Sequence, residues 1–183
     1  MISFKASLIN YTTINRINPR NEQYITSFVE LDTRNQEDFL ALQSIAKKWE
    51  NGFSLAQDVY NDFKCDRNGT HLFESVKKRF FALINEKKPV KMLDPDSILG
   101  IASVSNEQDE AFVLEFLQTN PEHKYGNENR KFKHIGKALL NSIIDILPNK
   151  DLKLYPVDKD AELFYRKNIF VKKQKAGFLK FRI

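Results

Sequence analysis

Hydrophobic and polar residues alternate with a period of two in several segments of the chain, which is typical of β-strands with one buried face. Residues 2–17 alternate well enough for a strand or hairpin, and residues 24–31 for another strand. Further strands are predicted at residues 79–85, 98–104, 111–119 and 151–155, and a terminal hairpin at residues 170–173 and 178–182 around Ala176-Gly177.

Other segments repeat their hydrophobic residues at helical spacing. Two of them follow a capping box, in which a Ser or Thr and a Glu or Gln three residues later bond to backbone N–H groups of the first turn. The first box is Thr33 with Gln36, for a helix to about Glu50 closed by Gly52. The second is Ser54 with Gln57, for a helix over residues 55–64. After this second helix, Asn68-Gly69 predicts a turn at residues 66–70.

A basic loop leads directly into a third helix. Hydrophobic residues recur at helical spacing from Gly136 until Pro148 stops the run. The first N–H groups of a helix have no intrahelical partner, and the helix dipole favours negative charge there. The loop adds positive charge through Arg130, Lys131, Lys133 and Lys137, which predicts a phosphate-binding site. The small Gly136 would let the phosphate approach the backbone. Taken alone, the loop also fits a solvated basic surface.

The segments around this loop favour the phosphate site over the solvated surface. Upstream, the strand at residues 111–119 ends in Asn120-Pro121. Downstream, the short strand at residues 151–155 precedes a helical segment, AELFYRKNIF, at residues 161–170.

This order of motifs resembles the GNAT superfamily of acyl-CoA-dependent N-acetyltransferases. The family's loop Q/R-x-x-G-x-G/A, which opens a helix after a strand, aligns with Lys131, His134 and Gly136. The resemblance covers about residues 98–170, and the N-terminal half is compatible with it but poor in motifs. The later family pattern, A-x-x-F-Y-x-K-x-G-F, is matched by Ala161, Phe164, Tyr165, Lys167 and Phe170.

The resemblance implies an α+β fold: a central mixed, mostly antiparallel sheet flanked by about four helices. It implies one domain over residues 1–183, with N-terminal strands or a hairpin at 1–30 and a cofactor-binding core at 98–170. Acetyl-CoA would be the co-substrate, with backbone groups of Leu117 and Thr119 along its pantetheine arm. The implied cofactor residues are Leu117, Thr119, Arg130, Lys131, Phe132, Lys133, His134, Ile135, Gly136, Lys137, Ala138, Asp158, Phe164 and Lys167.

The chain departs from the family pattern at three places. His134 replaces the first glycine, and histidine tolerates a positive φ better than most residues. The segment after Pro121 is longer than usual, and its tip either folds over the phosphates or remains mobile. Ile169 replaces a glycine of the second motif, where Asn168 can supply a left-handed C-terminal cap instead.

The implied chemistry is direct attack of an amine on the thioester, which needs proton removal from the amine, donors for the oxyanion and an acid for the thiolate. Tyr165, at the family's F-Y position, would be that acid, since a phenol pKa lies near 10. A tyrosine that merely packs on an amphipathic helix is the alternative.

Glu115 is the candidate base. It lies in an apolar strand, where alternation predicts that it shares a face with Val113, Leu117 and Thr119. If it faces the amine, partial burial would raise its pKa and help it accept a proton. A base or substrate anchor and an ordinary structural ion pair remain equally open for this carboxylate.

Composition sets the remaining limits. A chain of 183 residues with 42% hydrophobic content is the size of one domain with a real core. No apolar run approaches the roughly 20 residues of a membrane span, and MISFKASLIN lacks the apolar region of a signal peptide, so we expect a cytoplasmic protein. Cys65 is the single cysteine, which excludes an intrachain disulfide, and the three histidines lack ligand spacing, so no metal is expected.

The expected partners are acetyl-CoA and an amine acceptor, either a small molecule or a protein, with a homodimer possible. The net charge of +5 does not favour nucleic acid, since 24 acidic residues are interspersed and no binding motif occurs. The family analogy puts the acceptor near residues 49–60 and the terminal hairpin, although Trp49 itself is predicted to be core. A degenerate GNAT-like module that binds acyl-CoA or a protein without turnover is the alternative to an active N-acetyltransferase.

Overall fold

The computed structural model describes residues 6–17, 21–49, 55–70, 77–86, 93–107, 111–147, 151–168, 171–172 and 179–182. The order of elements in these residues follows the predicted one closely. The elements are β1 Ser7–Arg16, β2 Glu22–Leu31, α1 Gln36–Lys48, α2 Leu55–Asn68, β3 Lys77–Ile84, η1 Pro95–Ser97, β4 Ile98–Glu107, β5 Ala111–Thr119, η2 Pro121–His123, β6 Phe132–Lys133, α3 Ile135–Ile146, β7 Asp151–Leu154, α4 Lys159–Lys167, β8 Val171–Lys172 and β9 Leu179–Arg182.

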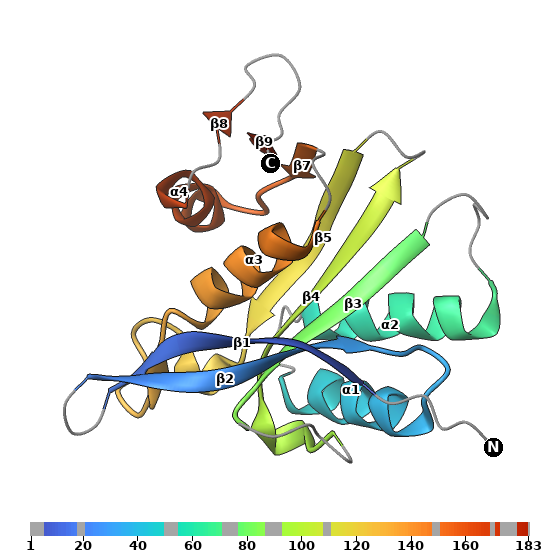
Figure 1. The fold of residues 1–183 in the computed structure, drawn as a ribbon, viewed down its shortest axis with the longest axis horizontal. Coiled ribbons are helices and arrows are strands. Elements are labelled where there is room, and N and C mark those ends of the chain that lie inside the picture. The colour runs from blue at the N-terminus through green and yellow to red at the C-terminus, as the bar shows by residue number, and fades with distance from the viewer. Residues whose placement is uncertain are drawn as a thin grey trace.

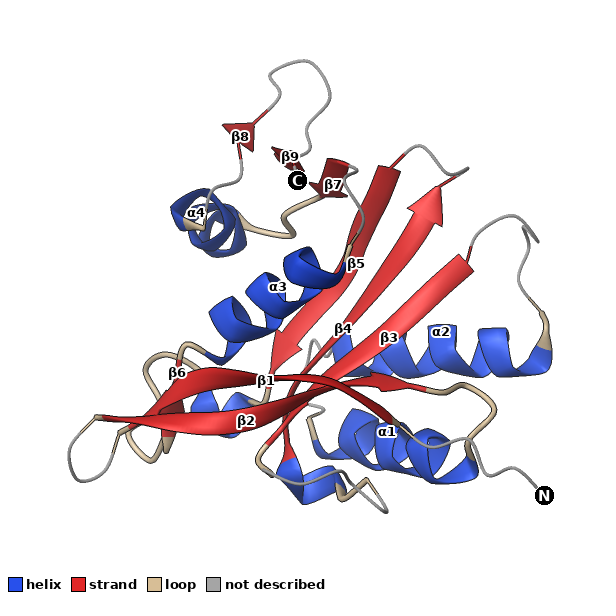
Figure 2. Cartoon of the chain, in the orientation of Figure 1, coloured by secondary structure: helices blue, strands red, loops and turns tan. Residues whose placement is uncertain are grey.

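The strands form one sheet in the order β6-β1-β2-β3-β4-β5-β7-β9-β8. Neighbouring strands are antiparallel except for β5 and β7, which are parallel. Figure 2 shows β3, β4 and β5 side by side and the β1–β2 hairpin crossing them at a steep angle. The predicted fold class, a mixed, mostly antiparallel sheet with four helices, is therefore confirmed for the described residues.

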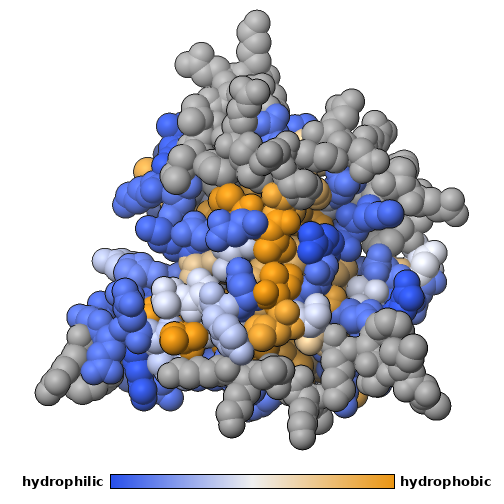
Figure 3. Space-filling model, in the orientation of Figure 1, coloured by the Kyte–Doolittle hydropathy of each residue, from blue (hydrophilic) through white to orange (hydrophobic). Residues whose placement is uncertain are grey.

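Helices cover both faces of the sheet (Figure 1). On one face, α1 and α2 pack against Val29, Phe80 and Ile101. On the other face, α3 packs against Phe28, Phe81 and neighbouring residues, and Phe164 and Tyr165 of α4 lie against the same core. Figure 3 shows hydrophobic residues in a band through the middle of the same view, with polar residues around them.

The beginning of α1 differs from the prediction. Asn35 is the N-cap, and its side chain accepts hydrogen bonds from the backbone N–H groups of Glu37 and Asp38. The predicted cap at Thr33 is wrong, because Asn is as common a cap as Ser and lies two residues closer to the helix. Trp49 is the C-cap. It is 5% exposed within the α1–α2 core, where it was predicted to lie.

Two further boundaries differ or lie outside the described residues. Helix α2 continues to Asn68, so residues 66–68 are helical and the predicted turn begins only at Gly69, which has a φ of 63°. β8 and β9 form the predicted terminal antiparallel pair. Gly52, Ser54 and the Ala176-Gly177 turn lie outside the described residues. Of the helices that the structure describes, none is long and apolar enough to cross a bilayer.

Gly100 in β4 provides a test of the packing between the sheet and α3. A Cβ at this position would lie 3.1 Å from Ile135 Cγ2 and 3.2 Å from the backbone oxygen of Gln118. The Gln118 carbonyl is held in the paired strand β5 and cannot easily retreat. We therefore expect Gly100→Ala to lower the free energy of unfolding by about 1–3 kcal/mol in urea titrations.

Gly136→Ala is the matched control for Gly100→Ala. A Cβ at Gly136 meets its nearest neighbours at an ordinary 3.4 Å, and alanine favours a helix over glycine by about 1 kcal/mol. This variant should be as stable as the wild type or more stable. Equal stability of Gly100→Ala and the wild type would contradict the tight contact between β4 and α3.

Candidate functional site

Strands β5 and β7 separate partway along the sheet. They pair in parallel only from Ala111–Asp151 to Leu114–Leu154. β7 ends at Leu154, and Pro156 soon follows without a backbone N–H, whereas β5 continues to Thr119. Among the described residues, the edge of β5 beyond Leu114 therefore has no strand beside it on the β7 side. Backbone groups on this edge are available to a ligand.

A cavity of about 660 Å³, called here the cofactor cavity, lies beside this part of β5. Its walls come from the end of β5, the loop after it, the first turn of α3 and one face of α4, and Figure 1 shows α3 and α4 on the same side of the sheet. The predicted site residues that line it are Leu117, Thr119, Arg130, Lys133, His134, Ile135, Gly136, Lys137, Phe164 and Tyr165.

The N-terminus of α3 opens into this cavity without a side-chain cap. His134 has a φ of 65°, a left-handed conformation of the kind that histidine tolerates better than most residues, and it makes no side-chain capping bond. By contrast, Asn35 caps α1 and Asp158 caps α4 through their side chains. The first intrahelical bond of α3 runs from the Ala138 N–H to the His134 oxygen at 2.9 Å. The preceding N–H groups, at residues 135–137, remain available to an anion.

Cations surround this helix terminus. Arg130, Lys133 and Lys137 were predicted there, and Lys124 joins them on the cavity wall. Asp160 is the acidic residue in the same lining. The cations and the helix dipole together favour a ligand with several negative charges.

Several predicted cofactor residues do not line the cavity. Phe132 is 5% exposed and packs its ring 5.3 Å from that of Tyr24, because it belongs to β6 and the core. Ala138 is buried in the same core. The Asp158 carboxylate is 2.7 Å from the Ala161 N–H, which it accepts as the α4 cap. Lys131 and Lys167 are exposed outside the lining.

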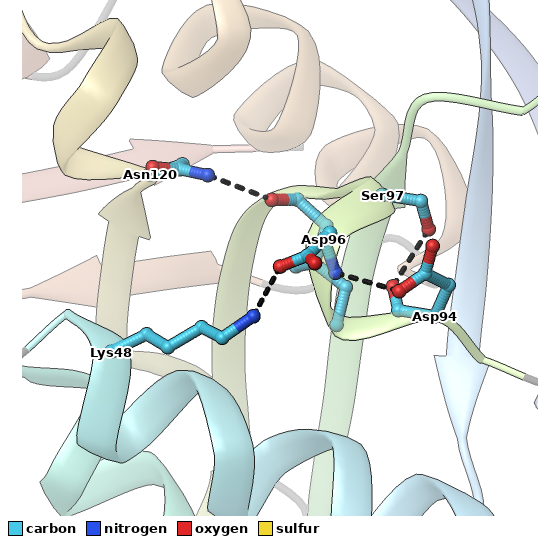
Figure 4. A network of polar contacts seen from close by, with 6 residues as sticks. Lys48, Asp94, Asp96, Ser97 and Asn120 are labelled. Carbon is cyan, nitrogen blue, oxygen red and sulfur yellow. Dashed lines mark hydrogen bonds and ion pairs between the residues drawn. The ribbon is translucent and has the colours of Figure 1, made fainter.

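The loop of residues 121–134 starts from a fixed point. The Asn120 side chain donates a hydrogen bond to the Ile98 oxygen at 3.3 Å, and its own oxygen accepts one from the Glu122 N–H at 3.0 Å. Figure 4 shows the hydrogen bond that the Asn120 side chain donates, beside an ion pair between Lys48 of α1 and Asp96 of η1. The end of β5 is thereby tied to β4, next to the point where α1 meets η1.

The far end of the loop is tied to β1. The Ile17 N–H donates to the Lys131 oxygen at 2.8 Å, and β6 pairs with the end of β1. Within the loop, the His123 ring packs edge-on against Phe132, with 5.2 Å between centroids. Burial lowers the pKa of His123, so the imidazole is neutral near pH 7. Its Nδ1 can then accept the Lys131 N–H, which lies at 3.4 Å.

Tyr165 of α4 lines the cavity with its neighbour Phe164, and their rings meet edge-on with centroids 5.1 Å apart. Burial raises the pKa of Tyr165 to about 12. The phenol therefore keeps its proton at physiological pH. Phe164 Cζ lies 3.4 Å from where a Cβ of Gly136 would be, so a larger residue at Gly136 would enter the space between α3 and α4.

Glu115 occupies a β-bulge. Ser103 and Val104 of β4 pair with Phe116 and Leu114, so Glu115 between them has no residue paired with it in the β4–β5 register. An extra residue of this kind reverses the alternation of side chains along a strand.

The bulge changes the face on which Glu115 lies. Leu114 and Leu117 pack toward α3, whereas Phe116 packs toward α1 and α2. Leu117 and Thr119 line the cofactor cavity, but Glu115 does not. Its carboxylate instead accepts a hydrogen bond from Ser105 Oγ at 2.5 Å. The prediction that Glu115 shares a face with Leu117 and Thr119 is therefore wrong.

Some lining residues escaped the sequence analysis. The unusual length of the loop after Pro121 was the signal for those that lie in it, and the loop does lie along the cavity. Asn168 has a φ of −107°, so the predicted left-handed cap is wrong, and its side chain caps the Phe164 oxygen at 2.8 Å instead. Ile169 and Phe170 lie outside the described residues. The lining residues that were not predicted to bind the cofactor are His123, Lys124, Tyr125, Asp160, Ala161 and Asn168.

In the part of the chain that the structure describes, no three His, Cys, Asp or Glu residues are arranged to hold an ion.

Comparison with known proteins gives likeness in structure but not in sequence. No protein-family model and no curated protein matches the chain at a significant level. A protein described as an acetyltransferase from Exiguobacterium sp. 255-15 superposes with a TM-score of 0.54 at 15% identity, over 86% of this chain and 93% of the other.

Two further structures show the same likeness. A protein described as a GNAT-family acetyltransferase, from Desulfovibrio desulfuricans, matches with a TM-score of 0.52 at 13% identity, over 85% of this chain and 94% of the other. A tyrosine-to-phenylalanine mutant of the toxin AtaT, bound to the C-terminus of its antitoxin AtaR and to acetyl-CoA, matches with a TM-score of 0.53 at 12% identity, over 86% and 92%. The protein therefore has the fold of the GNAT acetyltransferases, as its two sequence motifs predicted.

Proposed function

We propose that the protein is an acyltransferase that moves an acetyl group from acetyl-CoA to an amine. The observation that carries this proposal is the uncapped N-terminus of α3, which opens among basic side chains beside the unpaired edge of β5. A phosphate-bearing ligand with an extended arm fits both features. The acetyl-CoA bound to the AtaT structure supports the same choice of ligand.

The pyrophosphate would lie on the N–H groups of residues 135–137, with Arg130, Lys133 and Lys137 as its counter-ions. The pantetheine arm would run along the free edge of β5 and bond to its backbone near Leu117 and Thr119, as an added strand does. The thioester would then reach the point where β5 and β7 part.

At that point the amine nitrogen attacks the thioester carbonyl. A C–N bond forms, the C–S bond breaks, and the sulfur leaves as the CoA thiolate. Tyr165 donates a hydrogen bond to this sulfur. With a pKa of about 12, the phenol is a weaker acid than a thiol, whose usual pKa is about 8.5, so it stabilises the thiolate without surrendering its proton.

The amine must lose a proton as it attacks. Glu115 lies one residue beyond the last β5–β7 pair, on the sheet face that α1 and α2 cover. We propose that the amine arrives from this face, opposite the cofactor cavity, and that Glu115 takes its proton directly or through water. The Ser105 hydroxyl bonded to the carboxylate would orient it for this role.

A module that binds acyl-CoA without turnover is the second candidate, favoured by the absence of Glu115 from the cavity lining. Release of free CoA thiol from acetyl-CoA, measured with a broad panel of amines, separates the two. Amine-dependent thiol release supports the transferase. Tight CoA binding with no release above the spontaneous rate for any amine supports the binding module.

CoA should stabilise the protein by binding only its folded state. At a concentration 100 times its Kd it adds about 2.7 kcal/mol, which raises the melting temperature by about 5–10 °C for a chain of this size. Gly136→Leu should remove most of this shift, because its side chain enters the space bounded by Thr119 and Phe164.

Asn141→Leu, an exposed position on the same helix, should retain the shift and serves as the control for Gly136→Leu. Calorimetric titration of the wild type that gives neither heat nor a thermal shift would overturn the assignment of the cofactor cavity.

Tyr165→Phe keeps the ring and removes the donor. We expect turnover to fall about 100-fold, while CoA affinity and the melting temperature change little. Because burial raises the pKa of Tyr165, its neutral form persists to high pH, and wild-type turnover should show no loss from its ionisation below about pH 11.

Tyr155→Phe, at an exposed position outside the cavity lining, is the control and should turn over like the wild type. Wild-type turnover by a folded, CoA-saturated Tyr165→Phe protein would remove this residue from the mechanism.

A further inference from the structure

A second, smaller cavity of about 370 Å³ adjoins the cofactor cavity. Tyr125, Arg130 and Lys133 line both of them, so these three side chains form a shared wall. A ligand that extends from the N-terminus of α3 into the smaller cavity would contact these three residues. The rest of the smaller cavity comes from Ile17 and the loop residues 126–128.

Tyr125 is a large aromatic residue exposed on this wall. The residue is 89% exposed, more than any other of the described large hydrophobic residues. The Arg130 guanidinium lies over its ring, 5.2 Å from the centroid, in cation–π geometry. The pair therefore presents an aromatic surface and a positive charge at the same place.

The backbone holds this pair in position. The Asn127 N–H donates to the Lys124 oxygen at 3.2 Å, and the Arg130 N–H donates to the Asn127 oxygen at 3.3 Å. The Asn127 side chain accepts the Asn129 N–H at 2.9 Å. Since both ends of the loop are also fixed, at Asn120 and at β1, the residues between Tyr125 and Arg130 form a series of tight turns.

Coenzyme A has a matching chemical group beyond its pyrophosphate. Its adenosine end carries a flat purine and a 3′-phosphate. Purines stack on exposed aromatic rings, and arginine binds phosphate through paired, charge-assisted hydrogen bonds. Glu128, also on the wall of the smaller cavity, offers an acceptor for the exocyclic amino group of adenine.

We infer that Tyr125 and Arg130 bind the 3′-phosphoadenosine end of coenzyme A, Tyr125 by stacking on the purine and Arg130 by pairing with the 3′-phosphate. This inference rests on the proposed function. It assigns the loop of residues 121–131 a role in selecting the nucleotide end of the cofactor, separate from the pyrophosphate site at α3. The chain would then distinguish CoA from its 3′-dephospho form and from 4′-phosphopantetheine.

Calorimetric titration of these three ligands into the wild type and variants tests the inference. Tyr125→Ala should weaken CoA and 3′-dephospho-CoA together, by about 5- to 150-fold, since stacking on the purine is lost in both. Its affinity for 4′-phosphopantetheine, which has no purine, should stay that of the wild type. Tyr125→Phe keeps the ring and should restore the binding of both nucleotides.

Arg130→Gln should act on the 3′-phosphate. The ratio of the Kd for 3′-dephospho-CoA to the Kd for CoA should fall by about 10- to 100-fold relative to the wild type, as for loss of one charged hydrogen-bonded pair. This ratio isolates the 3′-phosphate even where Arg130 also contacts the pyrophosphate. Tyr11→Ala and Arg34→Gln, at exposed positions outside both linings, are the matched controls.

The outcomes separate this inference from the proposed function. Wild-type affinity of Tyr125→Ala for CoA would overturn the stacking, and an unchanged ratio in Arg130→Gln would overturn the 3′-phosphate contact, in both cases with CoA binding itself intact. Failure of the wild type to bind any of the three ligands would instead overturn the proposed function, and this inference with it.

Discussion

The hydrogen bonds between β5 and β7 end after Leu114 and Leu154, and the candidate site depends on this limit. Had the parallel pairing continued, the edge of β5 from Glu115 to Thr119 would be covered by a strand. Pro156 provides a local reason for the end of β7, because it has no N–H to donate. The chain then turns into α4, which brings Phe164 and Tyr165 over the gap that β7 leaves.

The bulge at Glu115 adds a second constraint at nearly the same place. It divides β5 into a paired half and an open half, and it reverses the alternation between them. Leu117 and Thr119 thereby face the cofactor cavity, while Glu115 lies with Ser105 on the other face. A single extra residue thus separates the side on which the cofactor would lie from the side on which the acceptor would arrive.

Sequence reasoning succeeded where the signal was local or repeated. The place of His134 in the loop motif, at a glycine position, indicated that a positive φ had to be tolerated there, and the start of α3 followed from helical spacing. It failed where a single inserted residue or a tertiary contact determines the position of a side chain. Alternation cannot reveal the bulge at Glu115, since residues 111–114 before it are apolar at every position and show no period that a bulge could interrupt. The position of Tyr125 depends on turns without periodicity. Lys131 and Phe132 lie within the motif but serve the pairing with β1.

The central claim is that acetyl-CoA lies along the open edge of β5 with its pyrophosphate at α3. Amide hydrogen exchange measured with and without saturating acetyl-CoA tests it most directly, because the backbone N–H groups on the free edge of β5 and those at residues 135–137 are otherwise available to water. The account predicts slower exchange in residues 115–119 and 135–137, and unchanged exchange in α1. Unchanged exchange in both segments, with acetyl-CoA shown to be bound, would contradict it.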